Sequence, residues 1–279
     1  MNFVSTDWLD AHLGDPDLRV IDASWHLPTS PRKGDVEFRE GHIPGAVCFN
    51  IDEIADVSVN LPHMLPQPEA FARAMGELGL GDGMRFVVYD SLGLFSAARV
   101  WWTLRAFGAK EVFILEGGLP KWKSEGRALA TGEAAPKPAI FTPRLDPSVV
   151  KGVADVKAAL ASGQQVVDAR PADRFEGRAP EPRPGLKSGH MPGALNLPYG
   201  ELIEHGRLKP KQALISVIQA HGVDLAKPVI TTCGSGVTAA IIGLAIAEAG
   251  GNFAGLYDGS WSEWGAREEC PVATGPARA

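Results

Sequence analysis

Three short motifs of the first half of the chain return in the second half, in the same order and offset by roughly 145 residues. They are Val20-Ile21-Asp22-Ala23 with Val166-Val167-Asp168-Ala169, His42-Ile43-Pro44-Gly45-Ala46 with His190-Met191-Pro192-Gly193-Ala194, and Glu116-Gly117-Gly118 before Trp122 with Asp258-Gly259-Ser260 before Trp264. This recurrence predicts two copies of one domain. We place the copies at residues 1–130 and 148–279, with residues 131–147, which begin with a stretch rich in Ala, Pro, Gly and Lys, as the linker.

Each half alternates short apolar runs with longer segments that have one apolar face. The runs of strand length are residues 86–89, 112–115, 229–232 and 253–257. Residues 239–249 have the pattern of a helix, and Gly250-Gly251 is a fitting helix end. A strand, helix, strand order predicts an α/β fold in which each domain has a mainly parallel sheet flanked by helices.

Composition excludes several classes of protein. The 279 residues include 27 Lys and Arg against 33 Asp and Glu, and a net charge of −6 argues against a nucleic-acid binder. Three cysteines without a C-x-x-C pair exclude a disulfide scaffold and a thiolate zinc site, and we expect no metal or organic cofactor. Residues 1–10 lack the basic flank of a secretory signal, and the apolar run 239–247 is shorter than the ~20 residues that cross a bilayer. We therefore expect a cytoplasmic protein without membrane contact.

Cys233 directly follows the expected strand 229–232 and precedes Gly234-Ser235-Gly236-Val237-Thr238. Ligands bind at the carboxyl ends of strands in an α/β sheet. A glycine-rich turn before a helix can direct several backbone N–H groups to one point, where they stabilise an anion such as a thiolate. This context favours a nucleophilic cysteine. Cys48 follows an apolar stretch and is expected in the core, whereas a redox role of Cys270 is open.

Two other anion-binding chemistries do not fit the same loop. A nucleotide P-loop would need the G-x-x-x-x-G-K-[ST] pattern, which does not occur in the sequence. A cysteine phosphatase would place an arginine six positions after the cysteine, and that position is Ala239. The loop is therefore not expected to bind a nucleotide or to hydrolyse a phosphate ester.

The motifs resemble the tandem-domain rhodanese family of sulfurtransferases over nearly the whole chain. The segment Phe38-Arg39-Glu40-Gly41-His42-Ile43-Pro44-Gly45-Ala46 resembles the N-terminal signature of the family, and Tyr257-Asp258-Gly259-Ser260-Trp261-Ser262-Glu263-Trp264 resembles its C-terminal signature. The resemblance implies two rhodanese-like domains, of which the first is inactive and the second forms a persulfide on its cysteine. Asp90 stands in the first copy where Cys233 stands in the second, and an aspartate cannot carry the transferred sulfur.

The loop sequence is similar to that of the family members that use 3-mercaptopyruvate. Thiosulfate-specific members have two cations after the cysteine, whereas this chain has the uncharged Gly234 and Ser235. The resemblance assigns binding of the donor to two arginines and to the loop. These residues are Arg174, Arg183, Gly234, Gly236, Val237 and Thr238. Two guanidinium groups suit a planar keto acid because each donates hydrogen bonds in a fixed fork. Arg170 is interpreted as structural.

Three further residues match a proton relay of the family. The resemblance places Asp52 and His63 in a relay with Ser235; alternatively, Asp52 caps a helix and His63 packs between the domains. His42 and His190 recur in both copies, including the inactive one, so we assign them to the fold rather than to catalysis.

The resemblance thus implies an enzyme that moves the sulfur of 3-mercaptopyruvate through a Cys233 persulfide to an acceptor and releases pyruvate. The acceptor would be a thiol, a thioredoxin-like protein or cyanide. Two alternatives stay open at this point: a thiosulfate:cyanide sulfurtransferase, and a non-catalytic module that carries sulfur or binds a partner.

Overall fold

Two five-stranded parallel sheets organise the chain, one in each of two units. The computed structural model describes residues 2–277. Unit 1 contains residues 2–57, 65–146 and 205–207, and unit 2 contains residues 58–64, 147–204 and 208–277. The short segment 58–64 therefore belongs to the unit formed by the second half of the sequence, although it lies in the first half.

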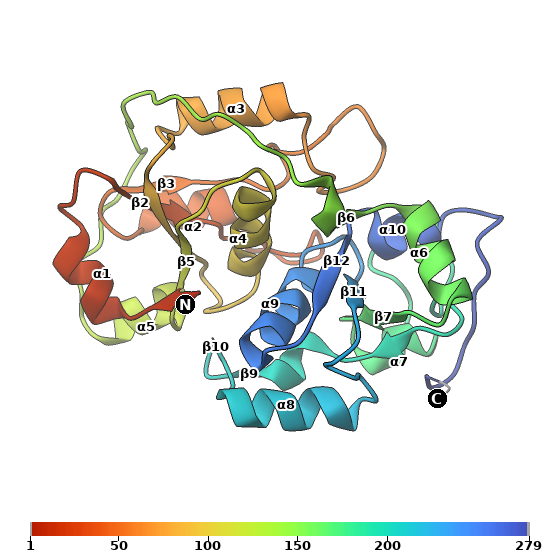
Figure 1. Cartoon of the computed structure of the whole chain (residues 1–279). Coiled ribbons are helices and arrows are strands. Elements are labelled where there is room, and N and C mark those ends of the chain that lie inside the picture. The colour runs from red at the N-terminus through yellow and green to blue at the C-terminus, as the bar shows by residue number, and fades with distance from the viewer. Residues whose placement is uncertain (1, 278–279) are drawn as a thin grey trace. The chain divides into compact units, whose positions relative to one another are not determined.

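The strands of unit 1 follow the order β1-β5-β4-β2-β3, and all are parallel. Helices α3 and α4 cover one face of this sheet, and α1 and α5 lie on the other (Figure 1). In chain order the elements are β1 (Phe3–Val4), α1 (Thr6–His12), β2 (Leu18–Asp22), α2 (Gly34–Glu40), β3 (Ala46–Cys48), α3 (Pro68–Glu77), β4 (Arg85–Tyr89), α4 (Ala97–Ala106), β5 (Val112–Leu115) and α5 (Gly118–Ser124).

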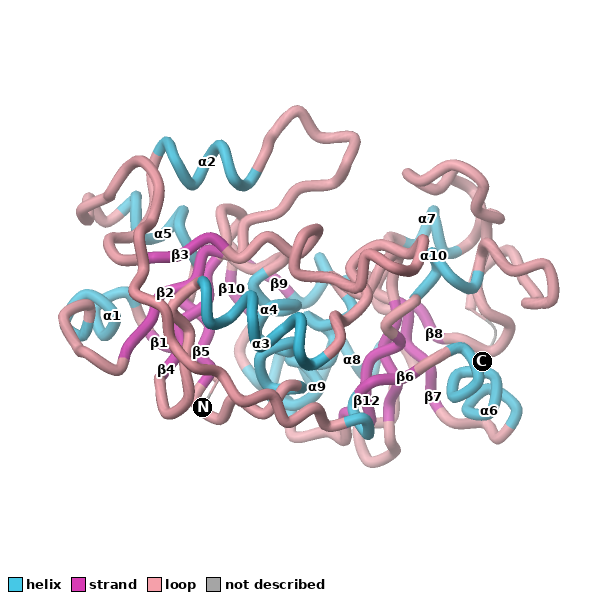
Figure 2. The backbone as a smooth tube through the Cα atoms, turned by 90° about the horizontal axis from the view of Figure 1, so that it is seen from above, coloured by secondary structure: helices cyan, strands magenta, loops and turns pink. Residues whose placement is uncertain are grey.

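The sheet of unit 2 has the corresponding order, β6-β12-β11-β7-β8, and is also parallel. Helices α8 and α9 lie on one face and α6 on the other (Figure 2). The elements are β6 (Val150–Lys151), α6 (Val153–Ala161), β7 (Gln165–Asp168), α7 (Ala172–Phe175), β8 (Leu195–Asn196), α8 (Lys211–Ala220), β11 (Val229–Thr232), α9 (Ala239–Ala249), β12 (Phe253–Tyr257) and α10 (Ser260–Trp264), with 3-10 turns at Pro147–Val149 and Tyr199–Leu202. Strands β9 (Ile203–Glu204) and β10 (Arg207–Leu208) form a separate ribbon.

The strands and the helix expected from the sequence are confirmed. All four residues of β11 are buried, as expected for a central strand covered on both faces. Helix α9 is apolar on nearly all sides because it packs between the sheet and α8, and it ends at Gly250, whose φ of 87° is left-handed. Residues 131–146 form no helix or longer strand. They lie against unit 1 through backbone hydrogen bonds, such as the one from the Ala139 N–H to the Gly76 carbonyl.

The burial of α9 predicts the effect of a core substitution on the free energy of unfolding. Ile242 is fully buried, so Ile242→Ala should lower the free energy of unfolding of unit 2 by about 2–5 kcal/mol, through lost apolar burial and the cavity left behind. The matched control is Ile140→Ala, since Ile140 is 82% exposed and its loss should change stability by less than ~0.5 kcal/mol. Urea unfolding measures both, and equal losses would contradict the packing described here.

Candidate functional site

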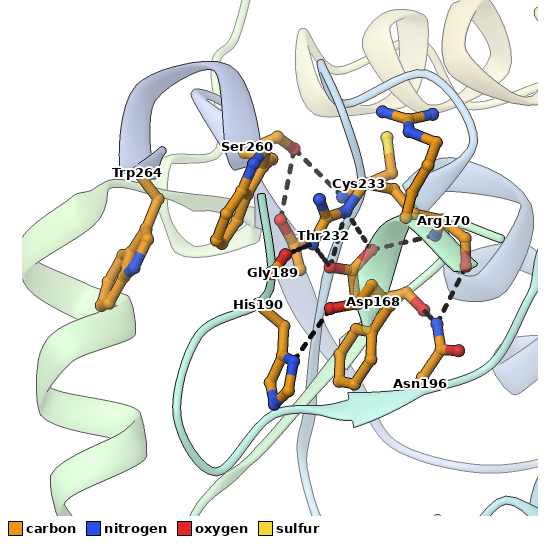
Figure 3. Close-up of polar contacts among 12 residues, drawn as sticks. Asp168, Arg170, Gly189, His190, Asn196, Thr232, Cys233, Ser260 and Trp264 are labelled. Atoms are coloured by element: carbon orange, nitrogen blue, oxygen red, sulfur yellow. Dashed lines mark hydrogen bonds and ion pairs between the residues drawn. The ribbon is translucent and has the colours of Figure 1, made fainter. Parts of the chain in front are cut away.

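Cys233 lies at the carboxyl end of β11, where the second sheet meets the start of a loop. It is 2% exposed, its N–H donates to Ser260 Oγ at 3.3 Å, and its carbonyl accepts the Trp261 N–H at 2.9 Å (Figure 3). These contacts come from the start of α10, which belongs to the C-terminal motif of the sequence. The cysteine is thus fixed from both sides of its backbone.

The loop from Gly234 to Thr238 turns the chain from β11 into α9. Gly236 has a φ of 77°, which is the left-handed region that favours glycine. The carbonyl of Gly234 accepts two hydrogen bonds from Ser262, from its N–H at 2.9 Å and from its hydroxyl at 2.7 Å. Ser235 and Val237 are buried. Hydrogen bonds to Ser262 and the left-handed Gly236 therefore define the conformation of the loop backbone.

His63 contacts this loop directly. Its Nδ1 lies 3.1 Å from Ser235 Oγ and 3.2 Å from the Ser235 carbonyl oxygen, and the imidazole is buried. The backbone of His63 has a φ of 60°, which is uncommon for a residue with a side chain and is held here by the surrounding contacts. The structure thus brings His63 and Ser235 together within unit 2. Asp52 lies in unit 1, where its carboxylate accepts the indole N–H of Trp25 at 2.8 Å.

Arg174 reaches the loop from the short helix α7. Its Nη2 lies 3.1 Å from the point that a Cβ on residue 234 would occupy, so the missing side chain of Gly234 leaves room for the guanidinium. Arg183 lies half-buried in the loop between α7 and β8. Arg178, in the same loop, is exposed and donates from Nε to Glu176 at 2.5 Å. The structure therefore brings Arg174, but not Arg178, to the residue after Cys233.

Behind Arg174 lies a buried chain of charges that sequence reasoning did not find. Asp168, Arg170 and Glu181 have side chains that are 1–2% exposed, and they connect to Arg174 through hydrogen bonds between carboxylates and guanidinium groups. Burial alone would lower the pKa of Arg170, but the charges and hydrogen bonds of Asp168 and Glu181 raise it above its usual value. Arg170 therefore stays charged inside the protein, in line with the structural role expected for it.

A family model described as the Rhodanese-like domain matches the chain twice, over residues 5–125 and over residues 152–267. The chain belongs to the rhodanese family. Both matches fall on the units that carry the two sheets, and the expected fold of two tandem rhodanese-like domains is confirmed.

Named relatives of this rhodanese-family chain match it over most of its length. It is 46% identical over 272 residues to the 3-mercaptopyruvate sulfurtransferase of Escherichia coli (strain K12), which is 97% of each chain. It is 39% identical over 292 residues to thiosulfate/3-mercaptopyruvate sulfurtransferase 1, mitochondrial, of Arabidopsis thaliana, over 96% of this chain and 77% of that protein. The crystal structure of SseA from Escherichia coli matches with a TM-score of 0.87 and 44% identity, over 93% of this chain and 98% of that chain.

The two rhodanese-like domains use their repeated histidines in the same way. His42 Nδ1 lies 2.7 Å from the Phe38 carbonyl oxygen, and its ring stacks on Phe38 at 3.9 Å. His190 Nδ1 lies 2.9 Å from the Phe175 carbonyl oxygen and stacks on Phe175 at 3.9 Å. Burial lowers the pKa of His190, which favours the neutral ring. These equivalent contacts support the assignment of both histidines to the fold.

The first rhodanese-like domain has a carboxylate where the second has Cys233. Asp90 follows β4 and is buried, and its carboxylate oxygens accept the backbone N–H groups of Leu92, Phe95 and Ala97 at 2.9, 2.6 and 2.9 Å. Burial raises the pKa of the Asp90 carboxyl, and these N–H groups partly offset the effect. The loop of this fold is thus able to converge three backbone donors on one acidic group.

The other two cysteines pack with the apolar cores of their units. Cys48 is partly buried against the core of unit 1, and Cys270 is buried in the core of unit 2. Within residues 2–277 no group of three or more His, Cys, Asp or Glu residues is placed to hold a metal ion. No helix in the same range is long and apolar enough to cross a membrane.

Cys48 should be nearly inert toward alkylation. Burial, and then the charges of Asp22, Asp35 and Glu53, raise its pKa to about 12. At pH 8 about one Cys48 in ten thousand would be a thiolate, against about a quarter of an ordinary cysteine thiol. Iodoacetamide labelling at pH 8, read by peptide mass spectrometry, should leave Cys48 unmodified in the folded protein and modify it in urea. Rapid labelling of Cys48 in the folded state would contradict its raised pKa.

Proposed function

We propose that this protein is a sulfurtransferase that moves the sulfur of 3-mercaptopyruvate to an acceptor through a persulfide on Cys233, with release of pyruvate. The observation that carries the proposal is a buried cysteine at the carboxyl end of a central strand, followed by a glycine turn that the Arg174 guanidinium approaches. The identity of 46% to the 3-mercaptopyruvate sulfurtransferase of Escherichia coli over 97% of each chain supports this choice of donor.

The reaction proceeds in two sulfur transfers. The thiolate of Cys233 attacks the sulfur of 3-mercaptopyruvate and forms an S–S bond, while the carbon–sulfur bond of the donor breaks. The electron pair of that bond moves onto carbon and leaves the enolate of pyruvate. An acceptor thiolate then attacks the outer sulfur of the Cys233 persulfide, so the acceptor becomes a persulfide and the Cys233 thiolate is restored. A thiol or a thioredoxin-like protein would accept the sulfur as a persulfide, and cyanide would accept it as thiocyanate.

Arg174 and Arg183 hold the carboxylate and the keto oxygen of the donor, because guanidinium groups donate paired hydrogen bonds to planar oxygen pairs. The backbone N–H groups of Gly234, Gly236, Val237 and Thr238 stabilise the negative charge on sulfur. The first domain supports this role for the loop, since its own loop directs three N–H groups at the Asp90 carboxylate.

The enolate of pyruvate needs a proton, and we assign its delivery to the Ser235 hydroxyl. His63 would resupply that proton, since its Nδ1 lies 3.1 Å from Ser235 Oγ. Asp52 would orient His63 in this relay, as the family resemblance implies. We further propose that the N-terminal domain, residues 1–130, is catalytically inactive because Asp90 cannot form a persulfide, and that residues 148–279 form the catalytic domain.

The second candidate, thiosulfate:cyanide sulfurtransferase, is favoured by one observation, the Arabidopsis relative whose name includes both donors. The uncharged Gly234 and Ser235 argue against thiosulfate as the main donor, since this dianion would be met by two fewer cations. A non-catalytic sulfur-binding module is disfavoured by the complete cysteine loop. The cytoplasmic location and the lack of nucleic-acid binding stay predictions of the sequence.

Replacement of the nucleophile tests the proposed function. Cys233→Ser should abolish turnover of 3-mercaptopyruvate, because a serine cannot hold the transferred sulfur. Mass spectrometry of the wild-type protein, after incubation with 3-mercaptopyruvate and no acceptor, should find one added sulfur atom on Cys233 and none on Cys48 or Cys270. Turnover that persists in Cys233→Ser would refute the mechanism, and a wild-type protein that gains no sulfur would favour the binding module.

Replacement of the arginines tests the choice of donor. Arg174→Ala and Arg183→Ala should each lower kcat/KM for 3-mercaptopyruvate by about 10–100-fold, since a hydrogen bond to a charged group contributes about 1.5–3 kcal/mol. The kcat/KM for thiosulfate should fall much less. Arg178→Ala is the matched control, because Arg178 is an exposed arginine of the same loop. A wild-type preference for thiosulfate, or equal losses with both donors, would show that the donor is assigned incorrectly.

A further inference from the structure

The Glu181 carboxylate joins two arginines and is itself almost fully buried. Its Oε1 accepts from Arg170 Nη1 at 2.7 Å, and its Oε2 accepts from Arg174 Nη2 at 2.5 Å, with Arg174 Nε at 3.4 Å from Oε1. The Glu181 side chain is 2% exposed. Both oxygens are thus used, and the carboxylate cannot turn without breaking a charged hydrogen bond in a region that excludes water.

One end of this arrangement is fixed independently of Glu181. Arg170 is 1% exposed, and Asp168 accepts from its Nε at 3.0 Å and from its Nη2 at 2.7 Å (Figure 3). The same Nη2 donates to the Gly189 carbonyl at 2.8 Å, and the guanidinium lies 4.2 Å from the ring centre of Trp261. Arg170 therefore cannot adjust to Glu181, and Glu181 transmits its position to Arg174.

The other end lies at the cysteine loop. Glu181 occupies the edge of the Arg174 guanidinium formed by Nε and Nη2, while Nη2 also lies beside the backbone of Gly234. Arg174 is 18% exposed, the most of the four charged side chains. It is the member of the chain that an incoming anion can reach, and its free edge is the one that Glu181 does not cover.

The charges of the four side chains cancel, since two carboxylates face two guanidinium groups. If Glu181 acted on the donor through charge alone, its negative charge would oppose the binding of a carboxylate. We propose instead that Glu181 is a positioning residue, which holds the Arg174 guanidinium beside the residue that follows Cys233 and presents its free edge to the carboxylate of the donor. This inference rests on the proposed function, because it assumes a donor that carries a carboxylate.

The substitution Glu181→Gln separates the two effects because they have opposite signs. Loss of the negative charge alone would lower KM for 3-mercaptopyruvate. Loss of the positioning should raise this KM by ~10-fold while kcat changes by less than ~3-fold, since one charged hydrogen bond to Arg174 is lost. The kcat/KM for thiosulfate, which has no carboxylate, should stay within ~2-fold. Glu176→Gln is the matched control, because it removes the ion pair with the exposed Arg178 in the same loop. It should leave kcat/KM unchanged for both donors.

A double-mutant cycle shows whether Glu181 acts through Arg174. In an Arg174→Ala background Glu181→Gln should have less than ~2-fold further effect, because the group that it positions is absent. Glu181→Asp is run in the same cycle, since it keeps the charge but is too short to reach both arginines, and it should raise KM as Glu181→Gln does. If the Gln variant does not fold, the Asp variant alone decides.

Four results would overturn the proposal: a lower KM in Glu181→Gln, an equal loss with both donors, losses that add to those of Arg174→Ala, or no change in Glu181→Gln. The first would show an effect of charge, and the second and third would show a structural effect on the whole loop. Failure of the proposed function is distinguishable, because it would appear in the wild-type protein as a preference for thiosulfate or as the absence of a Cys233 persulfide. A wild-type protein that uses 3-mercaptopyruvate, with an unchanged Glu181→Gln variant, would refute only the positioning role.

Discussion

The ion pair between Asp168 and Arg170 is the interaction on which the second domain depends at its functional end. Asp168 ends β7 and is in register with Thr232, the residue before Cys233. Arg170 extends from this strand end to the Gly189 carbonyl, to Glu181 and to the face of Trp261. One guanidinium therefore connects the strand beside Cys233 with the loop that carries Glu181 and with the helix that fixes the Cys233 backbone.

The first domain has the same turn after its strand but no arginine at the position of Arg170. Asp22 ends β2 and accepts the Ser24 N–H at 2.8 Å, just as Asp168 accepts the Arg170 N–H at 2.9 Å. The turn is the same, but Ser24 stands where Arg170 stands, and burial raises the pKa of the Asp22 carboxyl. Because this turn has Ser24 in place of an arginine, the first domain has no chain of charges equivalent to the one that ends at Arg174 in the second domain. The Asp90 carboxylate and the missing arginine are thus two separate differences from the second domain.

The fold and the nucleophile could be predicted from the sequence because both leave local patterns. The strand 229–232, the cysteine after it and the helix 239–249 lie within about twenty residues, where periodicity and glycine positions are informative. The membership of His63 in unit 2 could not be predicted, because a residue 172 positions before Ser235 has no local signal of that contact. The family resemblance alone placed His63 beside Ser235.

Glu181 was missed for a different reason. It lies in a proline-rich loop next to Arg183, and a glutamate in such a loop has the sequence pattern of a solvated surface residue. Its burial depends on two arginines, one eleven and one seven positions earlier, that converge on it only after the loop folds back. The available signal was the number of arginines near Asp168: several cations beside one another need carboxylate partners, and Glu181 is the carboxylate between them.

Burial of these four charged side chains is not expected to stabilise the fold, so their role has to be sought elsewhere. Removing a carboxylate or a guanidinium from water costs several kcal/mol per group, and the mutual attraction in the interior often only compensates for that cost. Well-packed apolar side chains would stabilise the same space at least as well. What apolar residues cannot do is hold a guanidinium at a fixed angle beside Gly234, because that requires hydrogen bonds with direction. The Asp168–Arg170–Glu181–Arg174 chain is therefore better explained by the orientation of its exposed end than by the stability of its buried one.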